Sequence, residues 1–304
     1  MNKVLVTGGT GFIGRELSKR LCEARYVLRK GHSVNHVDSY EIDSLDGETC
    51  WTGAFDGIDV VIHLAGLAHN KNYKDYQYEQ VNVAGTLKLA KDASRQGIKR
   101  FVFVSSIGVY GQSNLSEPFN NSSIVDPINN YTKSKYKAEC GLLKLAKETG
   151  LEVVIIRPTL VYGVGAPGNF GMLTQLVDKF SVLPFGLVNN RRDFIAVQNL
   201  ADILITCTSH PNAAGHTFLA SDSETVSIKE FTNAIGEGLG KKVLQLPIPV
   251  SLMRLVGKVT GKSAMIEQLY DDLQVDSSCL EEVLGWTAPF TMQQAMATLR
   301  KPSR

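Results

Sequence analysis

Residues 3–14 read KVLVTGGTGFIG, a short apolar run followed by a turn with three glycines and then by an amphipathic run that begins at Phe12. The order strand, glycine turn, helix points backbone N–H groups and the positive end of a helix at a phosphate. Gly8 allows the tight turn, Gly11 lets the backbone approach the phosphates, and Gly14 permits close packing of the helix on the strand. The stretch therefore predicts a dinucleotide-binding site at the start of the chain.

A tyrosine and a lysine stand four residues apart in the sequence Tyr131-Thr-Lys-Ser-Lys135, at the start of a predicted helix over residues 131–149. Residues at i and i+4 lie on one face of a helix. An ammonium that close favours phenolate over phenol, so Lys135 is expected to lower the pKa of Tyr131 from about 10 toward neutral pH. A tyrosine tuned in this way can exchange a proton with a carbinol–carbonyl pair. The alternative interpretation is a surface pair that arises by chance.

Two serines, Ser105 and Ser106, end a predicted buried strand over residues 100–105. Residues that contact ligands gather at the carboxyl ends of the strands in parallel, doubly wound sheets. A hydroxyl at this position can hold a substrate oxygen against Tyr131. The order of glycine turn, serine strand end and tyrosine–lysine helix along the chain therefore argues against the chance surface pair.

Together these motifs resemble those of the extended short-chain dehydrogenase/reductase family, in particular its nucleotide-sugar epimerase/dehydratase branch and the members found in bacterial polysaccharide clusters. The resemblance covers nearly the whole chain. It is carried by TGGTGFIG at 7–14, HLAG at 63–66, NVAGT at 82–86, SSIGVYG at 105–111, RPTLVYG at 157–163, RDFI at 192–195 and LGW at 284–286.

The resemblance implies a set of site residues. The catalytic residues it implies are Ser106, Tyr131 and Lys135. The cofactor-binding residues it implies include the glycines of the turn. They are Gly8, Thr10, Gly11, Phe12, Ile13, Gly14, Asp43, Leu64, Ala65, Gly66, Asn82, Val104, Tyr131, Lys135 and Pro158. On the substrate side it implies Ser106, Arg157, Asn169 and Arg192, of which Arg192 suits a diphosphate because a guanidinium binds phosphate oxygens in pairs. No metal is expected, and His63 is interpreted as a structural residue.

The cofactor is expected to be NAD or NADP. An NAD-preferring site has an acidic residue about twenty residues beyond the glycine turn, where it binds the ribose 2′-hydroxyl. This chain has Arg29 and Lys30 there. They could bind a 2′-phosphate, which favours NADP, or they could be a solvated surface pair.

The reaction implied by the resemblance is chemistry at C4 of a nucleotide-linked hexose, with a UDP-hexose 4-epimerase as the leading interpretation and NAD as its cofactor. The alternative is an NADPH-dependent 4-reductase of a UDP-4-keto-6-deoxy sugar. A non-catalytic NADP-binding regulator is less favoured because Ser106, Tyr131 and Lys135 are all present. A dehydratase is disfavoured because such relatives have an acidic pair where Ile107 and Gly108 stand. Uridine is inferred from the resemblance alone, since Asp271 and Asp272 have no arginine beside them in the sequence.

Composition limits the other classes of function. The 304 residues are 43% hydrophobic with a formal net charge of +2, which gives no electrostatic indication of nucleic acid or of an anionic membrane as a partner. Five cysteines without C-x-x-C spacing argue against a disulfide framework and a zinc site. No apolar run approaches the length of a membrane helix, and the N-terminus enters the first strand directly. A cytoplasmic homodimer that binds no nucleic acid and no membrane is expected.

The apolar pattern predicts an α/β fold of Rossmann type, a doubly wound parallel sheet with a small C-terminal substrate-binding lobe. Strands are expected at residues 3–7, 26–29, 34–37, 59–64, 100–105, 152–157 and 216–219. Helices are expected at 12–24, 76–96, 131–149, 199–209 and from Ser227 to Gly238. The predicted domains are 1–165 for the dinucleotide, with 192–220 packing on it, and 166–191 with 221–304 for the nucleotide sugar.

Overall fold

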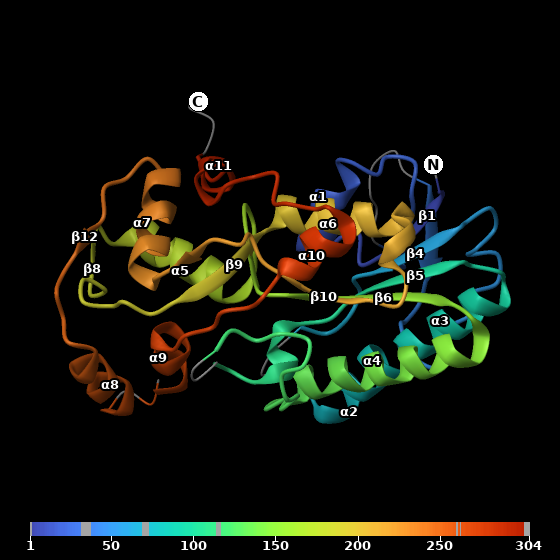
Figure 1. Cartoon of the computed structure of the whole chain (residues 1–304), viewed down its shortest axis with the longest axis horizontal. Helices are drawn as coiled ribbons and strands as arrows, with labels where there is room; N and C mark the ends of the chain where they lie inside the picture. The colour runs from blue at the N-terminus through green and yellow to red at the C-terminus, as the bar shows by residue number, and fades with distance from the viewer. Residues whose placement is uncertain are drawn as a thin grey trace.

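The computed structural model describes residues 2–31, 38–68, 73–113, 117–259, 261 and 263–300. Its central element is a seven-stranded sheet in which every described pair of neighbouring strands is parallel, in the order β10-β6-β5-β4-β1-β2-β3 (Figure 1). The strands are β1 (Val4–Thr7), β2 (Arg25–Arg29), β3 (Ser39–Ile42), β4 (Val60–His63), β5 (Arg100–Val104), β6 (Glu152–Pro158) and β10 (Thr217–Ala220). The order reverses between β1 and β4, which is where ligands bind in open parallel sheets. The predicted fold class is confirmed.

Helices cover both faces of this sheet (Figure 1). One face carries α1 (Phe12–Ser18), α6 (Val197–Ser209) and α10 (Ser278–Leu284), and the other carries α2 (Asp75–Tyr78), η1 (Glu79–Gly85), α3 (Thr86–Arg95) and α4 (Asn130–Thr149). Alternate residues of a strand point to opposite faces. Val4 and Val6 therefore pack with Leu200 of α6, whereas Leu5 packs with Leu89 of α3 and Leu142 of α4. Burial on both faces explains why these strands read as continuous apolar runs.

A smaller lobe has its own core. It contains a three-stranded sheet of β7 (Leu160–Tyr162), β9 (Arg192–Ala196) and β11 (Thr225–Val226), and a two-stranded sheet of β8 (Val182–Leu183) and β12 (Leu244–Gln245). Its helices are α5 (Gly168–Lys179), α7 (Ile228–Gly238), α8 (Val250–Val259), α9 (Ser263–Tyr270) and α11 (Met292–Ala297). Aromatic rings fill its centre, with Phe194 stacked on Phe231 at 3.8 Å between centroids and Tyr162 edge-on at 5.5 Å.

The chain passes between sheet and lobe more than once. After β6 it forms β7, α5 and β9 beside the lobe core, and it then returns to the sheet for α6 and β10. It leaves again for the segment from β11 to α9, returns for α10, and ends in the lobe with α11 (Figure 1). Two short 3-10 helices, η2 (Ile107–Tyr110) and η3 (Pro211–Ala213), complete the described elements.

Most expected elements are present within one or two residues, and one expectation needs correction. The helix expected at 12–24 ends at Ser18, because the chain must turn and enter β2 at Arg25. The strand expected at 34–37 lies outside the described residues. The edge strand β3 was not expected, because only Ile42 of its four residues is buried and its sequence therefore lacks an apolar run.

The helix expected at 76–96 is continuous but contains a π-helical segment, η1, at its middle. Such segments are rare and often occur at functional sites. The η1 residue Asn82 is buried, and its Oδ1 accepts from the Leu67 backbone N–H at 2.7 Å. Its Nδ2 donates to the Leu67 carbonyl at 3.0 Å and to Ser134 Oγ of α4 at 2.9 Å. Ser134 Oγ in turn donates to the Tyr131 carbonyl at 2.7 Å, so one amide joins the segment after β4 to the first turns of α4.

His63, the last residue of β4, is fully buried at the centre of the sheet. Its Nδ1 lies 2.6 Å from Thr7 Oγ1, and its Nε2 lies 2.8 Å from Thr86 Oγ1. Burial lowers the pKa of His63 to about 3, and the neighbouring charge of Lys135 contributes in the same direction. The imidazole is therefore neutral in the folded protein near neutral pH.

We expect His63 to make the protein less stable in acid. The unfolded chain protonates this histidine below about pH 6.5, whereas the folded protein resists protonation down to about pH 3, so the free energy of unfolding falls as pH falls through this window. Between about pH 7 and about pH 4.5 the loss from this one group is about 3 kcal/mol. Urea unfolding at the two pH values measures it. His63→Gln should reduce the loss by that amount and the control His210→Gln should not, and equal losses in wild type and His63→Gln would contradict the assignment.

Candidate active site

The glycine turn after β1 packs against the segment that follows β4. Gly8 has a φ of +76°, and a Cβ at this position would lie 2.8 Å from the Ala65 backbone nitrogen. A Cβ at Gly14 would lie 2.3 Å from the Gly8 carbonyl oxygen. Gly11 caps the start of α1 with no side-chain hydrogen bond. The turn therefore presents bare backbone at the start of a helix, as the phosphates of a dinucleotide require.

A buried hydroxyl at the end of β5 supports the same interpretation. Ser105 Oγ is buried and has no hydrogen-bond partner within the described part of the chain. Such atoms are rare in proteins, and a bound polar group is one way to satisfy them. The turn and this hydroxyl both fit a dinucleotide at the carboxyl edge of the sheet. Ser105 is not among the site residues expected from sequence, since only burial sets it apart from its neighbour Ser106.

The structure brings the three expected catalytic residues together beside β5. Ser106 begins η2, and its Oγ accepts from the Gly108 backbone N–H at 3.1 Å. Tyr131 lies in the first turn of α4, close enough to Ser106 for the serine hydroxyl to favour its phenolate form. Lys135 lies one turn further along α4, and its Nζ donates to the Val104 carbonyl at 2.9 Å. The hydroxyl, the phenol and the ammonium thus occupy one end of the sheet.

Local structure fixes the start of α4 against η2. Asn129 caps the helix, because its side chain accepts from the Thr132 backbone N–H at 3.0 Å. The Thr132 hydroxyl lies 3.3 Å from the Asn129 backbone nitrogen, which completes a capping box. A Cβ at Gly108 would lie 2.8 Å from Thr132 Cγ2, so η2 and the first turn of α4 are in close contact. This contact sets the position of Tyr131 relative to Ser106.

Burial controls the protonation of both titratable groups in the site. Burial raises the pKa of Tyr131 to about 12, and the hydrogen bond with Ser106 opposes the rise. Burial lowers the pKa of Lys135 to about 8, opposed by the charge of Glu139. The expected lowering of the Tyr131 pKa by Lys135 is therefore wrong for the protein without ligands. The desolvation of the phenol outweighs any nearby charge, and the group that favours phenolate is Ser106.

The other expected cofactor residues lie at or near the same carboxyl edge of the sheet. Leu64, Ala65 and Gly66 follow β4, and the Ala65 N–H donates to Thr7 Oγ1 at 3.2 Å. The remaining members of the set are Val104 at the end of β5, Pro158 at the end of β6, and Thr10, Phe12 and Ile13 in the turn and first residues of α1. Asn82 lies in η1, and its amide is engaged by Leu67 and Ser134, as described above.

Asp43 was expected to bind the cofactor at its adenine, but its described contact is with Lys30, just beyond the end of β2. Lys30 Nζ lies 3.0 Å from Asp43 Oδ1, and both side chains are mostly exposed. Arg29 is exposed at the last position of β2. The described contact of Asp43 is thus an ion pair, and its contact with adenine stays a prediction.

Arg157 has strong contacts inside the protein. Its Nε donates to Glu139 Oε1 at 3.0 Å, and its two terminal nitrogens donate to Glu139 Oε2 and to the Tyr110 hydroxyl. The guanidinium also lies over the Tyr110 ring, 4.8 Å from its centroid. These contacts tie β6 to α4 and η2. They support a structural role, and a contact between Arg157 and the sugar stays a prediction.

Arg192, at the start of β9, is buried and joined to the end of α9. Its Nη1 donates to the carbonyls of Gln268 at 2.9 Å and Asp271 at 2.6 Å. The fold therefore places an arginine beside Asp271, although none is adjacent in sequence. Asn169 lies partly buried in the first turn of α5. Contacts of Arg192 and Asn169 with a nucleotide diphosphate stay predictions.

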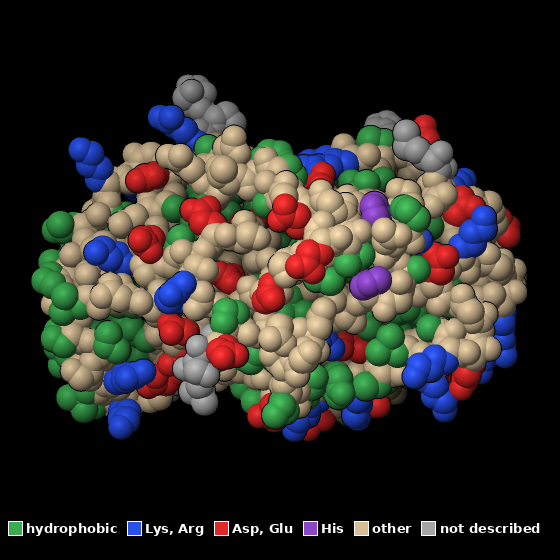
Figure 2. All heavy atoms as spheres, viewed as in Figure 1, with side chains coloured by type: hydrophobic (Ala, Val, Ile, Leu, Met, Phe, Trp, Pro, Cys, Tyr) green, Lys and Arg blue, Asp and Glu red, His purple; other side chains and the backbone are tan. Residues whose placement is uncertain are grey.

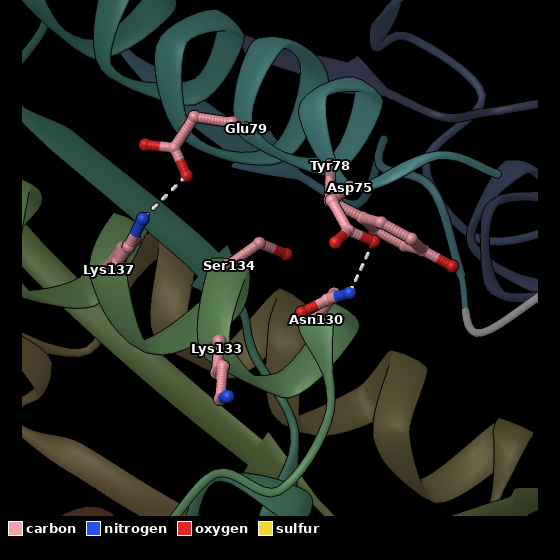
Figure 3. A pocket seen from close by; sticks show the side chains of 7 residues that line it. All are labelled: Asp75, Tyr78, Glu79, Asn130, Lys133, Ser134 and Lys137. Carbon is pink, nitrogen blue, oxygen red and sulfur yellow. Dashed lines mark hydrogen bonds and ion pairs between the residues drawn. The ribbon is translucent and has the colours of Figure 1, made fainter.

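A pocket of about 140 Å³ lies between the α2–η1 segment and the first turns of α4 (Figure 3). Figure 3 shows Asp75 facing Asn130 and Glu79 facing Lys137, with 2.8 Å between the Glu79 and Lys137 charges. Its lining consists of Asp75, Tyr78, Glu79, Asn130, Lys133, Ser134 and Lys137. None of these is a member of the catalytic set, although Ser134 accepts from Asn82 and donates to the Tyr131 carbonyl.

Comparison with known proteins gives relatives for the whole chain. A UDP-glucose 4-epimerase of Vibrio cholerae is 40% identical over 302 residues, which cover 96% of this chain and 92% of that protein. An Escherichia coli O157:H7 protein, N-acetyl-alpha-D-glucosaminyl-diphospho-ditrans,octacis-undecaprenol 4-epimerase, is 24% identical, with 97% and 93% covered. The crystal structure of UDP-N-acetylglucosamine 4-epimerase from Bacillus cereus superimposes with a TM-score of 0.81 at 18% identity, with 98% of each chain covered.

The sequence profile of the NAD dependent epimerase/dehydratase family matches residues 4–220, from the first residue of β1 to the last residue of β10. This span contains the glycine turn and the serine, tyrosine and lysine that the fold assembles. The chain belongs to the NAD-dependent epimerase/dehydratase family.

Proposed function

We propose that this protein is a UDP-hexose 4-epimerase that uses NAD. The observation that carries the proposal is the grouping of Ser106 and Tyr131, with Lys135 one helical turn away, at the edge of the sheet where the glycine turn also lies. The names of the Vibrio cholerae and Escherichia coli relatives, which both describe 4-epimerases, support C4 as the reacting carbon. UDP as the carrier is supported by the Vibrio cholerae relative.

The three catalytic residues have different tasks in this proposal. NAD, when bound, supplies the group that oxidises C4 and returns the hydrogen. Tyr131 exchanges the proton of the 4-hydroxyl as general acid and base. Ser106 holds the C4 oxygen and, through its hydrogen bond, favours the phenolate form of Tyr131. Lys135, seated on the Val104 carbonyl, keeps a cationic donor next to the site.

A second candidate is the NADPH-dependent 4-reductase of a UDP-4-keto-6-deoxy sugar. The basic end of β2, with Arg29 and Lys30, favours a cofactor that carries a 2′-phosphate. Tyr131 also holds its proton firmly in the protein without ligands, which suits a proton donor to a ketone. Against this candidate, Lys30 is paired with Asp43. The homodimer and the cytoplasmic location stay predictions.

The substitution Tyr131→Phe should lower turnover by about a hundredfold to ten-thousandfold, because it removes the general acid and base. Affinity for the cofactor should stay within about twofold, since the ring is retained. Turnover is measured with UDP-glucose, and cofactor affinity by titration. The matched control is Tyr136→Phe on the same helix, which should keep normal turnover. A Tyr131→Phe protein with more than about a tenth of normal turnover would exclude this tyrosine as the acid and base.

The fate of the cofactor separates the two candidate reactions. A 4-epimerase returns the hydrogen in each cycle, so we expect interconversion of UDP-glucose and UDP-galactose with no net change in absorbance at the reduced nicotinamide band. The reductase consumes one NADPH for each product. Stoichiometric loss of NADPH with a UDP-4-keto-6-deoxy sugar, combined with no interconversion of the C4 epimers, would overturn the epimerase in favour of the reductase.

The second candidate makes a prediction about Arg29. Only NADP carries the 2′-phosphate, so Arg29→Ala should weaken NADP binding about tenfold and leave NAD binding nearly unchanged. Lys30→Ala is the control and should have a smaller effect, because Asp43 already pairs with Lys30. Titration of each purified protein with both cofactors measures this. Equal losses of NAD and NADP affinity in Arg29→Ala would show that this arginine does not bind the 2′-phosphate.

A further inference from the structure

The far end of the lobe exposes a group of large apolar side chains, which we call the lobe-end face. Its members are Phe180, Val182, Leu187, Leu244, Leu246, Leu252, Leu255 and Val259. Figure 2 shows hydrophobic side chains gathered along this end of the molecule, where Figure 1 places β8, β12 and α8. Single exposed apolar residues are normal on a protein surface, but a contiguous group of them marks an interaction site.

Helix α8 contributes a stripe of exposed apolar side chains to the face. Its inner side packs into the lobe through Val250 and Met253. Its outer side carries Leu252, Leu255 and Val259, whose exposed fractions are 47%, 57% and 81%. Their spacing of three and four residues places them along one stripe of the helix. A helix that only covered the lobe core would carry polar residues on this stripe.

The stretch of sequence that supplies β12 and α8 to the face is rich in basic residues. The sequence from Leu239 to Ile266 contains five basic residues and no Asp or Glu, although the whole chain has a net charge of only +2. The five are Lys241, Lys242, Arg254, Lys258 and Lys262. Lys241 is paired with Asp178, and Arg254 lies 3.0 Å from Glu267. Lys242 and Lys258 are exposed and make no ion pair within the described residues. Arg254 and Lys258 stand on α8 itself, next to the apolar stripe.

We propose that the lobe-end face docks on the surface of a bilayer that contains anionic phospholipid. A helix with an outward stripe of leucines flanked by lysine and arginine binds in the interface plane, with its apolar side chains among the acyl chains and its cations at the headgroups. Among the described residues, no helix is long and apolar enough to cross a membrane, and the docking proposed here is at the surface. This docking departs from the expectation of no membrane partner.

A second copy of the chain is a poorer occupant of this face. A symmetric dimer would pair the same surface on both subunits and bring two sets of like charges together. Like charges that face each other across an interface oppose association. An anionic bilayer complements both the apolar residues and the cations. The docking also concerns residues outside the catalytic set, so it does not depend on the reaction proposed above.

Co-sedimentation of the full-length protein with vesicles tests the proposal. The vesicles contain phosphatidylcholine alone or phosphatidylcholine mixed with phosphatidylglycerol. We expect binding to the mixed vesicles, little binding to phosphatidylcholine alone, and loss of binding as salt shortens the range of the charges. Leu252→Gln combined with Leu255→Gln should raise the lipid concentration for half-maximal binding at least about tenfold. Lys242→Glu combined with Lys258→Glu should have a similar effect.

Matched variants control for general changes in surface chemistry. Ile124→Gln removes an apolar side chain that is 87% exposed elsewhere on the surface. Lys99→Glu with Lys144→Glu makes the same change in net charge away from the face, and both controls should bind as wild type does. All the substituted side chains are exposed, and urea unfolding and turnover should match wild type.

Three results would overturn the proposal. The first is wild-type protein that stays in the supernatant with the mixed vesicles. The second is undiminished vesicle binding by both the leucine variant and the lysine variant. If one of these variants fails to fold, undiminished binding by the other is enough to overturn the proposal, because each is compared separately with wild type. The third is a sedimentation-velocity result in which wild type is a dimer and the leucine variant is a monomer, with no vesicle binding. This result would assign the face to a second copy.

Discussion

The buried Asn82 amide links two of the segments that build the candidate active site. Asn82 binds both the N–H and the carbonyl of Leu67 and reaches Ser134 on α4. Without the amide, the partly buried N–H and carbonyl of Leu67 and the buried Ser134 hydroxyl would lose this partner, which makes the contact costly to lose. The π-helical turn of η1 is the local distortion in which Asn82 lies. This contact joins the segment after β4, which packs against the glycine turn, to α4, which carries Tyr131.

Burial of Tyr131 and Lys135 decides the charge state of the site. Burial raises the pKa of Tyr131 and lowers the pKa of Lys135, so both shifts oppose ionisation. The hydrogen bond from Ser106 acts in the other direction on the phenol. A site of this kind favours phenolate only when further positive charge or donors arrive with the ligands. Without ligands, the phenol of Tyr131 therefore keeps its proton near neutral pH.

Sequence predicted the parts of the structure that are determined locally. The glycine turn, the apolar strands and the Tyr131–Lys135 pair each depend on neighbours within a few residues, so their spacing is visible in the chain. The polar edge strand β3 lacks an apolar run and was missed. The pairing of Arg157 with Glu139 and the seating of Arg192 on the carbonyls after α9 join residues distant in the chain. Only the fold brings such groups together, and the pKa of Tyr131 required knowledge of its burial.

The path of the chain between sheet and lobe has a consequence for how the protein can be divided. Because α6, β10 and α10 belong to the sheet side while β11, α7 and α11 belong to the lobe, neither part is a continuous piece of sequence. No single cut yields an intact half, and a shortened chain that lacks the last helices loses a layer of both cores. Domain exchange and limited proteolysis are therefore expected to act on the sheet side and the lobe together, as one cooperative unit.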